Sequence, residues 1–563
     1  MNAAILAVIV LIAYALGYLF YSKFLSERIF GLDPDEPVPS KQCEDGVDFV
    51  PTRMHVLWGH HYTSIAGAAP IVGPALAVIW GWLPALLWVT LGTLTMGAVH
   101  DFSSLVVSLR NKGRSIGDIA GVVVNSRVRT LFLLIISFLI WVVLAVFAFI
   151  IGTLFVAYPG SIFPINIQIL IAVLLGWLVY RGGMGILWPS LIGYAILLAS
   201  VFVGQDVAAA IPALGSISVG AWVWLLMIYS FVASVLPVWL LLQPRDYLNS
   251  HQLITGLVLL TGGLFVLHPA VQAPALNPSP PGAPPILPFL FITIACGAIS
   301  GFHGLVSSGT TSKQVSCMTD ARPIGYGGML GEGAVGLLAI LATTAGFATA
   351  SEWHAHYASW GAASGLGPKL AAFVNGGGGF IAALGIPIGA AKIFVAVMVI
   401  AFAATSLDTG ARIQRLIISE LASAYGIRPL TNRYAASGVG IGAALVLALT
   451  QAGGKGGLIL WPLFGTTNQL VAGVTLLVVS IWLRKLGRPI RYTLIPMFVV
   501  AAATLVAMVE ELRGHLAAGN WLLATTAAAI LILDVWVLLE GLAALYAARP
   551  EPGPSGAPEG ISP

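Results

Sequence analysis

Apolar runs long enough to cross a membrane recur along almost the whole chain. Of its 563 residues, 58% are hydrophobic and only 9% are charged, whereas soluble proteins are about 25% charged. So few charges cannot cover a water-exposed surface of this size, which excludes a soluble enzyme, a disordered protein and a nucleic-acid binder. The sequence predicts an all-α polytopic membrane protein with about 15 transmembrane helices. The expected spans are residues 3–20, 64–80, 83–109, 130–157, 167–180, 186–204, 219–242, 251–268, 286–306, 327–350, 380–407, 434–451, 457–483, 492–509 and 520–546.

The basic residues fall into alternate loops between these spans. If the loop 110–129 is cytoplasmic, alternation places 22 of the 26 basic residues on the cytoplasmic side. The positive-inside rule describes this asymmetry, and one mistaken span would destroy it. The sorting therefore predicts an external N-terminus and a cytoplasmic C-terminus. The cytoplasmic segments would be 23–63, 110–129, 181–185, 243–250, 307–326, 408–433, 484–491 and 547–563.

Two stretches of the chain resemble each other. Residues 59–67 and 301–309 both fit the pattern G-x-H-x5-G, and the tripeptide at 97–99 recurs at 333–335. The first unit begins at the second predicted span and the second unit at the ninth, and because this advance of seven spans is odd, the units would point oppositely through the membrane. Inverted repeats with glycine-interrupted helices are typical of the binding sites of secondary transporters. Gly permits unwinding of a helix, and His, Ser and Thr supply partners for the freed backbone groups.

Longer blocks of the chain resemble the carbon starvation protein A family. The resemblance implies a transporter of the bacterial inner membrane that takes up peptides or pyruvate during carbon limitation. It also implies a five-plus-five inverted-repeat (LeuT-like) core, because the family is placed near the amino-acid–polyamine–cation transporters. The blocks are residues 55–74, 80–88, 97–102, 113–118, 405–412 and 463–469.

This comparison suggests how the chain is divided. Two repeat units, each opened by a broken helix, would form the core, with a pair of helices inserted between them. The first helix and the last two would be peripheral. The expected parts are a first helix at 1–22, a cytoplasmic segment at 23–63, repeat units at 64–204 and 286–483, an inserted pair at 219–268, C-terminal helices at 492–546, and a disordered tail at 547–563.

Polar residues in the two motif copies are the candidates for binding a carboxylate. His60 and His61 are expected to open the first broken helix, and His303 the second. Imidazole carries a proton near physiological pH and donates hydrogen bonds. Asn468, in an interrupted span, would contact substrate or satisfy the broken backbone. The substrate-binding candidates are His61, Ser64, Gly67, Gly301, His303, Ser307, Ser308 and Asn468.

Ionisable and hydroxyl residues within the spans are the candidates for ion coupling, because charge at bilayer depth is costly and usually functional. Asp101 would act in a gate or pair with Arg110 or Arg114. Glu332 and Lys392 would act separately or pair with each other. Hydroxyl oxygens suit sodium, whereas histidines and carboxylates suit a proton, so both coupling ions stay open. The candidates are His60, Asp101, Glu332, Lys392, Thr405, Ser406 and Asp408, the last of which has Arg412 four residues away as a structural partner.

Several other classes of function are less well supported. The three cysteines are far apart, and no Cys or carboxylate is spaced to complete a metal set with the histidines, so no metal or cofactor is expected. No P-loop motif is present. We expect a secondary active transporter that imports a short peptide or pyruvate by ion symport and alternating access, with membrane lipid around it and no nucleic-acid partner. The alternatives are a membrane starvation sensor and an integral-membrane enzyme.

Overall fold

The computed structural model describes residues 1–550, and within that range its regular elements are helices, apart from two isolated bridges. Eleven of the described helices are long and apolar enough to cross a membrane. Several continue into an adjoining π or 3-10 turn. The eleven contain α1 (Ala3–Leu16), α5 and α6 (Trp82–Gly92, Ala98–Arg110), α8 (Ser126–Ala157), α9 (Ile162–Tyr180), α10 (Leu187–Ala210), α13 (Leu242–Leu267), α16 (Gly328–Ala345), α20 (Ile388–Ala424), α22 and α23 (Gly456–Leu460, Phe464–Lys485), α24 (Arg491–Ala517) and α25 (Trp521–Ala547).

The predicted count of 15 crossings is not confirmed. Eleven predicted spans correspond to the long helices, and a twelfth corresponds to a bent pair. Two more are the shorter helices α12 (Val219–Val235) and α21 (Arg433–Leu449), and the last is interrupted by an unwound segment. The predicted span 167–180 is the greater part of the continuous helix α9.

The first break separates α3 (Met54–Ile65) from α4 (Ala69–Ala77), and the pair is bent by 45°. Pro70 explains why the helix cannot run straight through. It has no N–H to donate, and its ring would clash with the carbonyl of Ala66 in a continuous helix. Because α3 begins at Met54, the predicted cytoplasmic segment 23–63 includes most of this buried helix.

The second break is an unwound segment, 294–300, between α14 (Ile286–Thr293) and α15 (Gly301–Gly309). Gly297 has a φ of +93°, a conformation that side chains with a Cβ rarely adopt. One neighbouring span, Trp82–Arg110, satisfies two of the freed carbonyls: Trp88 Nε1 donates to Ile294 O at 3.1 Å, and Thr93 Oγ1 donates to Gly297 O at 2.9 Å. The break is therefore fastened to that span.

The two motif copies lie on opposite sides of their breaks. His61 precedes the first break, near the end of α3, whereas His303 follows the second break, in the first turn of α15. The expectation that His60 and His61 open a half-helix was therefore wrong. The short sequence match does not mark structurally equivalent positions.

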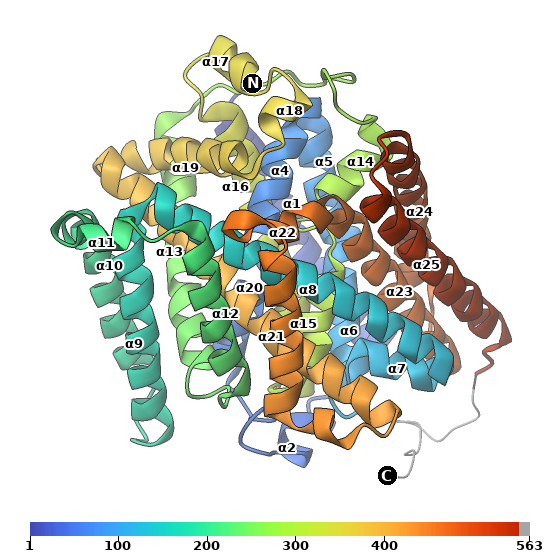
Figure 1. Cartoon of the computed structure of the whole chain (residues 1–563). Helices are drawn as coiled ribbons and strands as arrows, with labels where there is room; N and C mark the ends of the chain where they lie inside the picture. The colour runs from blue at the N-terminus through green and yellow to red at the C-terminus, as the bar shows by residue number, and fades with distance from the viewer. Residues whose placement is uncertain (551–563) are drawn as a thin grey trace.

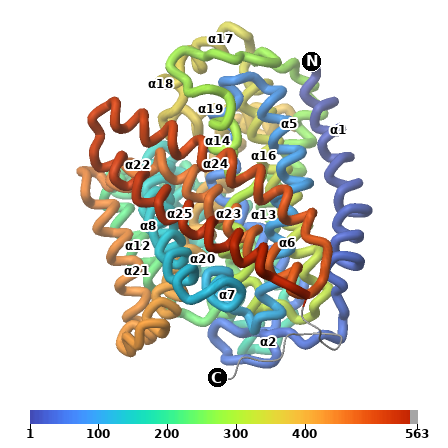
Figure 2. The backbone as a smooth tube through the Cα atoms, turned by 90° about the vertical axis from the view of Figure 1, so that its right-hand side faces the viewer, coloured from blue at the N-terminus to red at the C-terminus, as the bar shows by residue number. Residues whose placement is uncertain are grey.

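The two ends of the helix bundle differ in the segments that they gather (Figure 1). The N-terminus lies at the same end as α17 (Ala350–His356) and α18 (Trp360–Ala363), and α2 (Pro39–Gln42) lies at the opposite end. Figure 2 shows α1 at one edge and α24 and α25 lying over the face of the bundle. Less than half of each of these three spans is buried, whereas α8, α16 and α23 are mostly buried. The predicted tail lies almost entirely outside the described residues.

Segments predicted to be cytoplasmic meet one another at a single end. Arg110 of α6 pairs with Glu36 at 2.7 Å. Asp48, in the segment before α3, lies 2.6 Å from both Arg412 and Arg415 of α20. These contacts agree with the sorting of basic loops onto one side. Which side of the membrane that is stays a prediction.

Asp48→Asn is expected to destabilise the protein by about 3 kcal/mol, the low end for breaking a buried ion pair, because the carboxylate is 23% exposed. Burial raises the pKa of the Asp48 carboxyl, but Arg412 and Arg415 outweigh it and hold that pKa well below its usual range. The stabilisation is therefore present above about pH 4 and lost only in stronger acid.

Unfolding of purified protein in detergent, followed from pH 8 to pH 3, measures this effect. The gap between wild type and variant should stay constant down to about pH 5 and then close. Glu44→Gln, on an exposed residue of the same segment, should change stability by less than about 0.5 kcal/mol. A gap that closes near pH 7 would contradict the assignment.

Candidate functional site

His303 lies at the centre of a buried group of ionisable side chains beside the second break. Its Nδ1 is 3.4 Å from Asp101 Oδ2, and its Nε2 is 3.2 Å from Glu332 Oε2. All three side chains are fully buried. Three elements, α15, α6 and α16, therefore bring together residues that are far apart in the sequence. The proposed pairing of Asp101 with Arg110 or Arg114 was wrong, since those arginines pair with Glu36 and Asp118.

Neighbouring groups hold the two carboxylates in place. His100 Nδ1 lies 3.0 Å from Asp101 Oδ1, and the backbone N–H of Gly297 donates to Glu332 Oε1 at 3.0 Å. Cys296, on the unwound segment, completes a compact set: single ligand atoms of Cys296, His303 and Glu332 lie within 4.8 Å of one another. The sequence indicated no Cys or carboxylate near the histidines, because these residues meet only in the fold.

Several polar atoms in this interior lack a hydrogen-bond partner within residues 1–550. They include His61 Nε2 and Ser307 Oγ, whereas the ring nitrogens of His303 face Asp101 and Glu332 at ion-pair distance. His61 Nδ1 lies 3.0 Å from Thr311 Oγ1. Unpartnered buried polar atoms are rare in folded proteins, and a group of them marks a place for water or a ligand.

Two of the predicted serines have structural roles. Ser308 Oγ donates to Gly304 O at 2.7 Å and accepts from Ile116 N at 3.1 Å. Ser64 Oγ lies 3.0 Å from Thr409 Oγ1. These hydroxyls tie the half-helices to α7 (Ile116–Val123) and α20.

A second buried cluster surrounds Arg245, at the start of α13. Its guanidinium group contacts Asp408 of α20 and lies 3.1 Å from Asp246 Oδ1. His60 Nδ1 lies 2.5 Å from Asp246 Oδ2, and Tyr229 donates to Asp408 Oδ2 at 2.8 Å. All four ionisable groups are at most 3% exposed. Asp408 is thus paired with Arg245, and not with Arg412, which binds Asp48.

Thr405 and Ser406 are already engaged by protein groups. Thr405 Oγ1 accepts from Asn249 Nδ2 at 2.7 Å and donates to Ala401 O at 3.0 Å. Ser406 Oγ donates to Ser64 O at 2.8 Å. Gly67 lies against Ser406, where a Cβ would come within 2.5 Å of its hydroxyl oxygen. The first break is therefore fastened directly to α20.

Asn468 satisfies the backbone of the second break. Its Oδ1 accepts from the N–H of Phe302 at 2.9 Å, and its Nδ2 donates to Ser300 Oγ at 3.0 Å. Gly301 lies so close to α23 that a Cβ would be 2.3 Å from Asn468 O. Of the two roles that the sequence left open for Asn468, these contacts show the structural one.

Lys392 lies away from both clusters. It is in the second turn of α20, not at the middle of the span, and it is half-buried. Thr405 follows it by 13 residues, or about 20 Å of helix. Within residues 1–550 Lys392 has no salt bridge, and Glu332 faces His303 instead. The expected Lys392–Glu332 pair was wrong.

Sequence reasoning missed the residues that complete the second cluster. Residues 243–250 were predicted to be a cytoplasmic loop, but they form the first turns of α13, where Arg245 and Asp246 are buried. The one signal available in the sequence was that these two residues are adjacent, carry opposite charges and have no Gly next to them. Tyr229 and Asn249 carried no signal.

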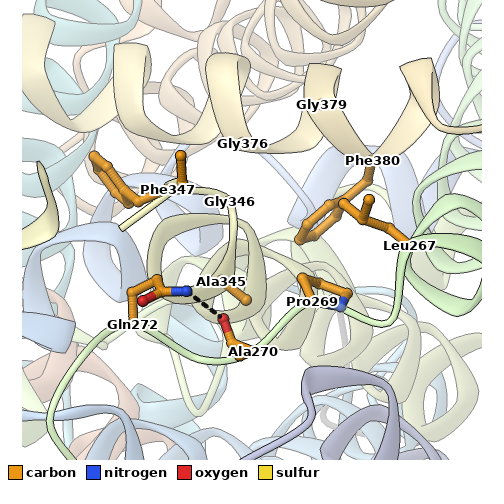
Figure 3. A pocket seen from close by; sticks show the side chains of 11 residues that line it. Leu267, Pro269, Ala270, Gln272, Ala345, Gly346, Phe347, Gly376, Gly379 and Phe380 are labelled. Atoms are coloured by element: carbon orange, nitrogen blue, oxygen red, sulfur yellow. Dashed lines mark hydrogen bonds between the residues drawn. The ribbon is translucent and has the colours of Figure 1, made fainter. Parts of the chain in front are cut away.

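A cavity of about 330 Å³ is separate from both clusters. Figure 3 shows it between the end of α13, the end of α16 and α19 (Leu366–Ala382). Leu267, Phe347 and Phe380 line it, with Gly346 and Gly376. Among the described residues no ionisable side chain lines this cavity, so it lacks the chemistry of the two clusters.

Comparison with known proteins identifies the family of this chain. A family model described as Carbon starvation protein CstA matches residues 2–355 and 347–507. The chain belongs to this family. It is 33% identical to the peptide transporter CstA of Campylobacter jejuni over 579 residues, which cover 91% of this chain and 81% of that protein. It is 32% identical to the peptide transporter CstA of Bacillus subtilis, over 88% and 87% of the two chains.

Another relative of this CstA family member is named for a different substrate. The pyruvate/proton symporter BtsT of Escherichia coli is 39% identical over 342 residues, which cover 59% of this chain and 47% of that protein. Among solved structures, a manganese transporter of Eremococcus coleocola aligns over 90% of this chain and 99% of its own, with 12% identity and a TM-score of 0.48.

Proposed function

We propose that this protein is a secondary active transporter that imports a small carboxylate-bearing nutrient, a short peptide or pyruvate, across the bacterial inner membrane during carbon starvation. Its relatives are named as transporters of these two substrates, which supports a transporter over a sensor or an enzyme. The observation that carries the proposal is the group of unpartnered buried polar atoms where a helix break meets α6 and α16. His61, His303 and Ser307 would hydrogen-bond the substrate carboxylate there.

An inverted five-plus-five repeat would supply the alternating access. Structural landmarks recur at a nearly constant spacing: the break at 66–68 is followed by a π turn at 93–97, and the break at 294–300 by a π turn at 322–327. Each landmark of the second unit comes about 230 residues after its counterpart. Each broken helix also contacts the second helix of the other unit, α4 against α16 and α15 against α6. Two such units can rock against each other around a site at the breaks.

We assign the coupling ion as a proton, carried by the cluster of His60, Asp246, Arg245 and Asp408. With neutral His60 the four buried groups carry a net charge of −1, and with protonated His60 they carry none. A buried net charge is costly, so gain and loss of this proton would change the relative stability of conformations. A cavity of about 110 Å³, lined mostly by apolar side chains, borders Arg245 and Tyr229.

Sodium is the weaker candidate because protein groups already fill the expected site. Thr405 and Ser406 are engaged in hydrogen bonds with protein groups, and the guanidinium of Arg245 contacts Asp408. A cation bound there would face that positive charge at close range. The two residues predicted for sodium, Thr405 and Ser406, make contacts between helices instead.

Uptake of labelled pyruvate and of a labelled dipeptide into proteoliposomes tests the proposal. A proton gradient, inside alkaline, should drive accumulation of one of them by about tenfold for each pH unit at one proton per substrate. A sodium gradient alone should drive none. His303→Gln should abolish uptake, whereas His354→Gln, on an exposed residue of α17, should not. Sodium-driven accumulation would overturn the ion assignment, and no uptake of either substrate would overturn the substrate class.

A further inference from the structure

We propose that Cys296, His303 and Glu332 bind a transition metal ion of the zinc type at the second helix break. The three residues come from the unwound segment, from α15 and from α16. At most 6% of each side chain is exposed. His303 belongs to both this site and the proposed substrate site, but the two proposals fail separately, because metal binding is measured on purified protein without a gradient.

The distances suit ligands around a shared ion. Two ligands that each lie about 2.0–2.1 Å from a tetrahedral zinc are roughly 3.3 Å apart. His303 Nε2 and Glu332 Oε2 form an ion pair at 3.2 Å, and this separation is also that of two ligands on one ion. The Cys296 ligand atom is within 4.8 Å of both, which a small inward movement would close.

A second layer of contacts already orients these ligands. Asp101 lies 3.4 Å from Nδ1 of His303, the ring nitrogen that faces away from Glu332, and His100 holds Asp101 in turn. The N–H of Gly297 fixes the other oxygen of Glu332. Histidines that bind metals usually have their second nitrogen fixed by a carboxylate in this way.

The mixture of ligands selects the class of ion. A thiolate, an imidazole and a carboxylate favour zinc and its neighbours over magnesium or calcium, which prefer oxygen alone. Three protein ligands leave a fourth position open. An ion held here would connect the unwound segment to α15 and α16, so it would restrain the break.

Cobalt binding tests the site, because a thiolate bound to Co²⁺ gives a charge-transfer band in the near ultraviolet. The protein for this test carries Cys43→Ser and Cys317→Ser, which leaves Cys296 as its one thiol. We expect one Co²⁺ per chain and a thiolate band that Zn²⁺ displaces. Adding Cys296→Ala should remove the band, and Asp101→Asn should weaken binding by about 10–100-fold. His61→Ala, in the same polar interior but outside the set, should leave the band intact.

Two results would overturn the assignment. One is the absence of the thiolate band in the Cys296-only protein, which needs no variant of the site itself and so does not depend on a substitution being tolerated. The other is a band of unchanged strength after His303→Ala and Glu332→Gln, which would mean that the thiol holds cobalt without the other two residues. Elution as a single symmetrical peak on size exclusion checks that each variant is folded.

Discussion

Arg245→Met is expected to destabilise the protein by about 3–5 kcal/mol, the cost of breaking a buried ion pair by removing one partner. Asp246 and Asp408 would then share a buried interior with no cation except a protonated His60. Arg245→Met/Asp408→Leu removes one charge of each sign and should be more stable than the single variant. Thermal unfolding of the purified proteins in one detergent measures this recovery as a double-mutant cycle.

The matched control is Arg513→Met. Arg513 pairs with Glu510 at 3.0 Å, but its side chain is 71% exposed, and an exposed pair contributes about 0–1 kcal/mol. The same substitution should therefore change the free energy of unfolding very little at this position. If Arg245→Met is as stable as Arg513→Met, or if the double variant is no more stable than the single one, Arg245 does not neutralise the buried aspartates.

The sequence predicted individual polar residues better than the partners they have. His303 was predicted from its motif, and Glu332 from its position in an apolar span. The partner proposed for Glu332 was wrong, because contacts between spans depend on how each helix is rotated, and hydropathy does not report that rotation. Lys392 illustrates the same limit, since a shift of the helix start moved it from the middle of the span to its beginning.

The buried cluster around Arg245 was harder to find for a second reason. Charged residues between two apolar runs are typical of a loop. Placing them in a cytoplasmic loop also satisfied the positive-inside rule. Arg245 and Asp246 can be buried only because Asp408 and His60 approach them from other helices. The breaks were easier to predict, since a glycine-containing motif lies beside each of them, although only the structure shows that Asn468 and Trp88 hold the second one.

His60→Gln is expected to uncouple transport from the proton gradient without abolishing substrate binding. Gln still donates a hydrogen bond to Asp246, but it takes up no proton, so the cluster keeps its net charge of −1 throughout the cycle. Accumulation under a gradient of one pH unit should fall from about tenfold to none. Exchange of labelled for unlabelled substrate at equal pH needs no net proton movement, and it should persist.

Comparing the two assays separates a coupling role from a structural one. A structural defect would lower exchange and accumulation together, whereas loss of the coupling proton lowers accumulation alone. His251→Gln is the control, because His251 lies on α13 like Asp246 but is half-buried and bonds only to its own helix among the described residues, through Tyr247 O. That variant should accumulate substrate like wild type. Tenfold accumulation by His60→Gln would exclude His60 as the carrier and leave Asp101, with His303 and Glu332, as the remaining buried ionisable path at the breaks.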